Sequence, residues 1–306
     1  MSSTDYILKK FFYILLMLIT IILISFFSVK LIPGDPVSAM FGQKGPTKEQ
    51  REVEEKKLGL DKSIPEQFKT YLINIFKFSF GNSYVYRDQT TFSLVWPNFK
   101  ITFLIAFLSC ILGSIIGIFF GSLSSLWRNT KKSFILNSIF MFLLSTPTFI
   151  IGFTLQYYLG FCWNISEISG TIYLPILTLA LAASGSIFKI TFNNMKESLK
   201  QPYITTAYAK GLSTKTVIFK HALKNASIPI LAQIGLIFNG LISGAAITES
   251  IFNLQGIGSS TILAFENRDF PVLQCSIILL GIFISIFNLL LDLIYFWLNP
   301  TINKKK

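Results

Sequence analysis

The chain has 306 residues, of which 52% are hydrophobic and 14% charged, and its formal net charge is +12 at pH 7. A mean hydropathy of +0.58 excludes an ordinary soluble globular domain and indicates a polytopic membrane protein, because several uncharged runs approach the about 20 apolar residues that cross a bilayer. The positive charge does not indicate nucleic-acid binding, since the basic residues lie beside or between apolar runs.

The first segments are an apolar run over residues 11–32 and a polar region over 33–100. The run follows Lys9 and Lys10 and is too long for a signal-peptide core, so we expect residues 1–32 to form a cytoplasmic N-terminus and a retained span. The polar region contains ten Lys/Arg and eight Asp/Glu. Within it, Thr47 and Gln50 predict a capping box that opens a helix ending at Gly59.

A second helix is predicted after Pro65 in the polar region. It carries a single apolar stripe, formed by Phe68, Tyr71, Leu72, Ile75 and Phe76. Such a helix either packs against the spans or lies in the membrane interface. The sequence favours this structural role over a contact with substrate.

Five further spans are predicted within the core at 101–298, and glycine and proline mark two of them. Gly113, Gly117 and Gly121 repeat at four-residue spacing, which lets a neighbouring helix approach closely. Pro147 predicts a kink inside one span. The expected spans are residues 101–126, 134–159, 172–192, 228–251 and 272–298.

The distribution of basic residues predicts the orientation. With the N-terminus inside, the predicted cytoplasmic segments contain fifteen Lys/Arg. The short outer loops at 163–170 and 253–271 contain one basic residue, Arg268. By the positive-inside rule both termini are cytoplasmic, including the tail at 299–306, and residues 33–100 are extracytoplasmic. The loop at 193–227 is the most basic cytoplasmic segment.

Few side chains in the predicted spans can carry chemistry. No phosphate-binding glycine loop is present, and the single histidine, His221, has no metal-ligand partner nearby in the sequence. Glu249 and Asp292 fall toward the ends of spans, where a structural role is favoured over a place on a transport pathway. An ion-coupled carrier remains an alternative, and a membrane enzyme is a weaker one.

The loop at 193–227 has its own helical pattern. Residues 201–210 predict a short helix, Gly211 supplies a left-handed helix end, and Ser213 predicts the cap of a second helix reaching to about residue 225. Pro229 then falls near the start of the next span. A solvated basic loop would explain the charge but not this structure, so we expect the loop to bind a cytoplasmic partner.

The same loop resembles the coupling loop of ABC importer permeases, whose pattern is E-A-A, three residues, Gly, nine residues, then I-x-L-P. Ala207, Gly211 and Leu223 match this pattern. Four positions depart from it, namely Thr205, Thr206, His221 and Lys224. The segments AYAKGL and KHALKNASIP nevertheless resemble the version found in dipeptide and oligopeptide permeases.

Other segments resemble the B-type subunit of that family in the same order. They are LIPGDPV (31–37), LGLDKSIPEQF (58–68), FGNSY (80–84), TESIFNLQGIG (248–258), RDFPVLQ (268–274) and NLLLDLIYFWLNPTI (288–302). The likeness therefore covers nearly the whole chain.

This resemblance implies an all-α permease of the type I ABC importer fold with six spans, located in the inner or plasma membrane. It implies a second, similar permease subunit, two cytoplasmic ATPases that hold ATP and Mg, and an extracytoplasmic solute-binding protein that delivers peptide. This chain would itself be non-enzymatic and hold no cofactor or metal. Nickel and glutathione importers remain alternatives. The implied coupling residues, as surface and hinge, are Ala207, Lys210, Gly211, Leu212, His221, Ala222 and Leu223.

Overall fold

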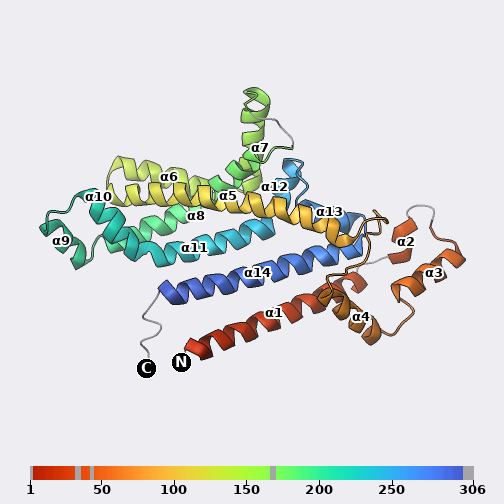
Figure 1. The fold of residues 1–306 in the computed structure, drawn as a ribbon. Helices are drawn as coiled ribbons and strands as arrows, with labels where there is room; N and C mark the ends of the chain where they lie inside the picture. The colour runs from red at the N-terminus through yellow and green to blue at the C-terminus, as the bar shows by residue number, and fades with distance from the viewer. Residues whose placement is uncertain (1–2, 32–35, 42–44, 166–169, 299–306) are drawn as a thin grey trace. The chain divides into compact units, whose positions relative to one another are not determined.

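The fold was analysed in a computed structural model that describes residues 3–31, 36–41, 45–165 and 170–298 (Figure 1). The elements assigned in these residues are all helices, and one isolated bridge pairs Asn82 with Thr90. Two compact units arise from the chain. Unit 1 comprises Met1–Ile101 and Gln255–Leu289, and unit 2 comprises Thr102–Leu254 and Leu290–Lys306.

Within the described residues, five helical stretches are long and apolar enough to cross a membrane, and a bent helix pair makes a sixth if it counts as one span. If the bent pair is counted as one span, the six predicted spans are confirmed. The stretches belong to α1 (Ser3–Leu31), α5 (Thr91–Leu126), α8 (Tyr173–Ser198), the run from α10 to α11 (Thr214–Ser243) and α14 (Phe270–Leu298).

Two of the predicted spans differ from the helices in the structure. The kink expected at Pro147 is a break of 102° between α6 (Lys131–Ser145) and the pair formed by α7 (Thr148–Leu155) and η2 (Gln156–Cys162). Helix α5 begins at Thr91 rather than near residue 101 and contains Pro97. The start of this span was predicted from the first apolar residues alone. A helix can begin outside the hydrocarbon layer with polar residues such as Lys100, so α5 is longer than its apolar part.

In unit 1, the predicted helices of the polar region are present, after a short α2 (Pro36–Phe41). Helix α3 (Lys48–Leu58) has the expected capping box of Thr47 and Gln50, and Gly59 at its end has φ +65°. Arg51 pairs with Glu55 at 2.8 Å, one helical turn away. These caps and pairs stabilise a helix with no buried residue, which packing alone would not support.

Helix α4 (Ile64–Phe76) packs against α1, as its apolar stripe predicts. The ring of Phe26 lies 5.1 Å from that of Phe68 and 5.4 Å from that of Tyr71. The Tyr71 hydroxyl donates to Ser25 Oγ at 3.0 Å. The structural role expected for this stripe is confirmed, although Phe76 at its end is exposed.

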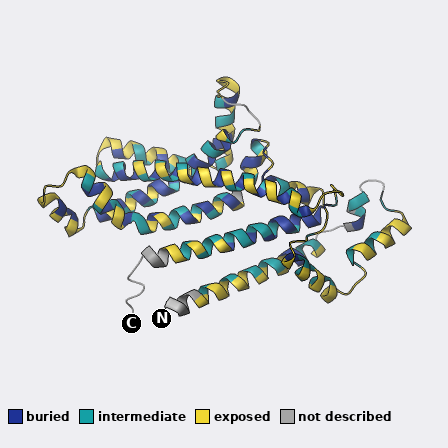
Figure 2. Cartoon of the chain, in the orientation of Figure 1, coloured by how far each residue is buried: buried dark blue, intermediate teal, exposed yellow. Residues whose placement is uncertain are grey.

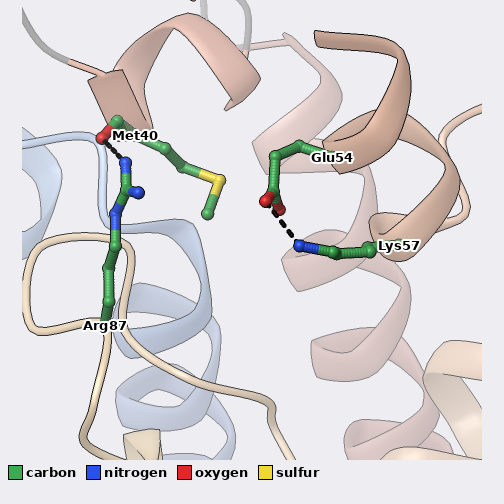
Figure 3. Close-up of polar contacts among 4 residues, drawn as sticks. All are labelled: Met40, Glu54, Lys57 and Arg87. Carbon is green, nitrogen blue, oxygen red and sulfur yellow. Dashed lines mark hydrogen bonds and ion pairs between the residues drawn. The ribbon is translucent and has the colours of Figure 1, made fainter. Parts of the chain in front are cut away.

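A buried carboxylate orders the loop that precedes α5. Asp269 accepts a hydrogen bond from the Ser83 hydroxyl and another from the Tyr84 backbone N–H at 3.1 Å. Arg87 of the same loop donates to the Met40 carbonyl of α2 (Figure 3). Arg87 also lies over the Phe41 ring, 4.8 Å from its centroid. The loop is thus held at both of its sides within unit 1.

In unit 2, α5 packs closely on α8 through the glycine stripe. A Cβ added at Gly113 would lie 2.8 Å from the Ala180 carbonyl oxygen, and one at Gly121 would lie 2.8 Å from the Thr191 Cβ. The three glycines lie where α5 and α8 approach each other closely. On another side of α8, the Phe140 and Phe188 rings stack with centroids 4.3 Å apart.

Candidate functional site: the loop between α8 and α11

The loop begins with a tight turn at the end of α8. The Gln201 N–H donates to the Ser198 carbonyl at 3.1 Å, and Pro202 then occupies the first turn of α9 (Pro202–Ala209). Proline is well suited to this position because the N–H that it lacks would have no partner within the helix. The predicted short helix is therefore confirmed.

Gly211 ends α9 in the predicted left-handed conformation, with φ +75°. Its N–H donates to the Tyr208 carbonyl at 2.9 Å, and the Leu212 N–H donates to the Ala207 carbonyl at 3.3 Å. These two bonds make a Schellman motif, which satisfies carbonyls that the helix end would leave free. The position requires glycine because of its backbone angle, since an added Cβ would meet nothing within 4 Å.

The second helix of the loop continues into the membrane span without an interruption. Ser213 caps α10 (Thr214–Thr216), which is followed by the π-helical η3 (Val217–Ala222) and by α11 (Leu223–Gly244). The separate helix predicted to end near residue 225 is thus wrong. Pro229 lies inside α11 rather than near its start. Proline removes one hydrogen bond there, but a long span with neighbours tolerates that loss.

A small apolar core holds the loop together. Its buried members are Met195, Ile204, Ala207, Val217, Ile218, Ala222, Ala226 and Ile230, and Leu223 packs partly buried against them. At its edge the Ser198 hydroxyl donates to the Ala222 carbonyl at 3.0 Å, and the same hydroxyl lies 2.6 Å from the Tyr203 hydroxyl. The end of α8, α9 and η3 therefore form one packed body.

This core changes the placement of two predicted coupling residues. Ala207 and Ala222 were expected on the contact surface, but they are 4% and 0% exposed within the chain itself. Their small side chains let α9 and η3 approach each other, and an alanine spacing alone does not indicate which surface an alanine faces. Lys210, Gly211 and Leu212 are exposed, and His221 is half-buried at the end of η3.

The exposed side of the loop carries Leu212, which is among the predicted coupling residues, and three aromatic side chains that the sequence did not indicate. Phe219 is 52% exposed, and Tyr203, Tyr208 and Leu212 are also exposed. Figure 2 shows that α9 carries both buried and exposed positions. Four exposed lysines accompany them, at positions 210, 215, 220 and 224. We call these four large side chains and four lysines the loop surface. Exposed aromatic residues are enriched at protein–protein contact sites, and the lysines surround them with positive charge.

The membrane acids lie apart from this loop. Glu249 on α12 (Ala246–Ile251) is 1% exposed and accepts a hydrogen bond from the Thr102 hydroxyl on α5. Asp292 is half-buried on α14. The buried Asp269 was not predicted, although its position directly after Arg268, which has φ +54°, fits a constrained turn.

Two family models match the chain and together cover most of it. Residues 113–304 match the binding-protein-dependent transport system inner membrane component. Residues 3–98 match the N-terminal part of the membrane component of such systems.

Curated relatives match over almost the whole length. The chain is 32% identical to the dipeptide transport system permease protein DppB of Lactococcus lactis subsp. cremoris, with 97% of this chain and 98% of that protein covered. It is 31% identical to the glutathione transport system permease protein GsiC of Pectobacterium atrosepticum, over 98% and 99% of the two chains. A probable peptide ABC transporter permease, y4tP of Sinorhizobium fredii, is also 31% identical, over 97% and 98%.

Solved structures share the fold. A chain of the MetNI methionine ABC transporter in an inward-facing conformation superposes with a TM-score of 0.60 at 19% identity, over 67% of this chain and 96% of that one. A chain of an amino acid ABC transporter crystallised with histidines gives a TM-score of 0.53 at 17% identity, over 66% and 93%. The all-α permease fold expected from the sequence is confirmed. This chain belongs to the family of binding-protein-dependent transport system inner membrane components, which are multi-pass membrane permease subunits.

Proposed function

We propose that this chain is one of two permease subunits of an ATP-driven importer of short peptides. The family itself takes solute from a binding protein. Peptide as the cargo is supported by the dipeptide and peptide permeases among the relatives. The observation that carries the proposal is that the loop surface stands on a compact core continuous with a membrane span.

In this proposal the loop surface is the docking site for an ATPase subunit on the cytoplasmic side. Phe219, Tyr208 and Leu212 supply apolar contact area, and the lysines attract an acidic partner surface. ATP and Mg belong to two ATPase subunits, and this chain holds no cofactor. A second, homologous permease and an extracytoplasmic binding protein complete the proposed complex, with both termini of this chain in the cytoplasm.

The buried alanines have an indirect role in the same proposal. Ala207 and Ala222 keep α9 and η3 in contact, so a movement imposed on the loop surface displaces the loop as one body. A change in the conformation of the ATPases would then shift the spans between outward-facing and inward-facing states. Gly211 holds the loop in shape through its backbone.

The docking proposal is tested by Phe219→Glu in the assembled complex. A charge in the centre of a packed protein contact would stay partly desolvated, so we expect at least a tenfold loss of co-purified ATPase while the permease still inserts. Val53→Glu on α3 is a matched control, since Val53 is 51% exposed and lies outside the loop. Full ATPase content in Phe219→Glu would overturn the docking site.

A second candidate cargo is glutathione, because curated relatives also include glutathione permeases. Both cargoes can be compared in vesicles that contain the whole importer and its binding protein. We expect uptake of a labelled dipeptide. An excess of unlabelled dipeptide should block this uptake, and glutathione should not. Preferential uptake of glutathione would select the second candidate instead.

A further inference from the structure

Unit 1 contains a cavity of about 630 Å³ whose wall joins the ends of two membrane-crossing helices. Lys30 contributes from the last turn of α1, and Phe270 is the first residue of α14. The rest of the wall comes from α3, α4 and the segments beside them. Because the cavity lies at the ends of two spans, it lies at the depth of the bilayer headgroups.

The described wall of this cavity is basic. It contains four lysines, Lys30, Lys56, Lys57 and Lys62, and no Asp or Glu. Glu54, outside the wall, pairs with Lys57 at 2.8 Å (Figure 3). The carboxylate therefore offsets only one of the four charges directly.

Lys30, in the last turn of α1, has neutral partners. Lys30 Nζ donates to Gln67 Oε1 at 2.6 Å and lies 5.1 Å from the centroid of the Phe26 ring. An amide oxygen and a ring face orient the ammonium group without cancelling its charge. Lys62 contributes to a lowered pKa of Glu66, behind the larger effect of the hydrogen bonds from Ser63. The wall as a whole keeps a positive charge.

Neutral donors and rings supply the remaining chemistry. Tyr84 lines the cavity, and burial, with a smaller effect of Asp269, raises its pKa to about 12, so its phenol stays protonated. Asn74 and Gln274 add amide groups. Ammonium, hydroxyl and amide donors around one cavity suit a phosphate oxygen, while Phe26 and Phe270 suit the apolar part of an amphipathic molecule.

Helix α4 gives an independent indication that this region meets lipid. While one side of α4 packs on α1, Ile73 and Phe76 are exposed, and Phe78 directly after the helix is exposed as well. Phe76 reaches 80% exposure. A helix with one packed side and large apolar residues left on its surface is typical of an element in the membrane interface.

We propose that this cavity binds the phosphate of an anionic phospholipid headgroup, held by Lys30 and Lys62 and by the amide and hydroxyl donors of the wall. The site is separate from the loop surface and from the peptide cargo. A soluble phosphate ester offers the same charged group without acyl chains and is the alternative source of the ligand.

The test uses the full chain in its assembled complex, reconstituted in phosphatidylcholine nanodiscs doped with phosphatidylglycerol. Retained lipid is counted by native mass spectrometry for the wild type and for Lys30→Gln/Lys62→Gln. One basic residue at a membrane surface changes lipid affinity by about fivefold, so we expect at least a tenfold loss of phosphatidylglycerol from the double variant. Lys69→Gln/Lys77→Gln is the control, because it removes the same charge from exposed residues of this region that do not line the cavity.

Three results would overturn the proposal. Equal loss in the control variant would mean that general surface charge attracts the lipid. Equal retention of phosphatidylcholine and phosphatidylglycerol would mean that the cavity does not select an anion. Displacement of the lipid by soluble glycerol phosphate at the same concentration would assign the site to a soluble ester. The proposal is supported if the wild type and the control variant retain phosphatidylglycerol and only the cavity variant loses it. This result does not depend on the cargo of the importer.

Discussion

A Cβ placed on Gly117 of α5 would lie 2.7 Å from the Cβ of Ile187 on α8 and 2.9 Å from the Ser184 carbonyl oxygen. Neither the backbone nor a branched side chain can give way cheaply, so Gly117→Ala should force the two helices apart. We expect a loss of about 1–3 kcal/mol in the stability of the purified chain, measured as a lower unfolding temperature in detergent. Gly240→Ala is the control, because an added Cβ there meets nothing within 4 Å. Equal effects of the two changes would contradict the close packing.

Gly211→Val should disturb the loop through its backbone alone. A β-branched residue at φ +75° costs about 1–3 kcal/mol, and space is not limiting because the Cβ site is open. We expect faster hydrogen exchange of the amides at 208–213 and reduced ATP-dependent uptake, with normal insertion. Leu212→Val, at the exposed neighbouring position, should leave exchange unchanged. Wild-type exchange in Gly211→Val would exclude a structural need for glycine.

Asp269→Ala should release the loop around Ser83. The variant leaves the Ser83 hydroxyl and the Tyr84 N–H without their buried acceptor, which costs about 1–3 kcal/mol. We expect earlier proteolysis between residues 82 and 88 and a milder effect of Asp269→Asn, whose amide oxygen still accepts. Asp88→Ala, at an exposed position of the same loop, serves as the control. Identical cleavage rates in all variants would show that Asp269 does not hold the loop.

Alkaline pH should weaken unit 1 through two tyrosines. Burial raises the pKa of both Tyr71 and Tyr84 from 10 to about 12, so the unfolded chain loses these protons at lower pH than the folded chain does. Their contribution is fully present below pH 10 and is lost as the pH rises from about 10 to about 12. Spectrophotometric titration should show phenols that ionise late, and Tyr71→Phe and Tyr84→Phe should each remove part of that late phase. A single phase near pH 10 in the wild type would contradict this prediction.

The predicted orientation can be tested with single cysteines. The background needs Cys162→Ser, because Cys162 is exposed whereas Cys110 and Cys275 are buried. In intact cells with any outer barrier opened, an impermeant thiol reagent should label Lys48→Cys and spare Lys215→Cys. Both positions are exposed, so both should react once the membrane is permeabilised. Labelling of Lys215→Cys in intact cells would show that the chain has the opposite orientation.

Local signals predicted much of this fold. The glycine stripe at 113, 117 and 121, the capping box at Thr47 and the left-handed end at Gly211 depend on chain spacing and backbone angles, and the structure has all three. Hydropathy located the spans but not their ends, because Thr91 and Lys100 continue α5 beyond its apolar part. The sharp break at Pro147 was underestimated as a kink, since a proline predicts a lost hydrogen bond and not an angle.

The loop surface was harder to predict because it depends on tertiary packing. Ala207 matches the coupling-loop pattern and Ala222 falls at an unspecified position within it, but the pattern does not say whether an alanine contacts a partner or its own chain. Phe219 lies between buried Ile218 and exposed Lys220, in a π-helical turn that shifts the usual periodicity of exposed positions. Asp269 was missed for a similar reason, since its hydrogen-bond partners come from residues far away in sequence.

The continuity of η3 with α11 has a mechanical consequence. Thr214–Ser243 is one helical rod of 30 residues, about 45 Å long, with the loop surface at one end. Phe219 is thus joined to α11 by uninterrupted helix, whereas α8 is joined to the loop by a short turn and by the hydrogen bond from the Ser198 hydroxyl to the Ala222 carbonyl. In the proposed function, a displacement of the loop would therefore reach α11 directly, and would reach α8 through the turn that follows Ser198.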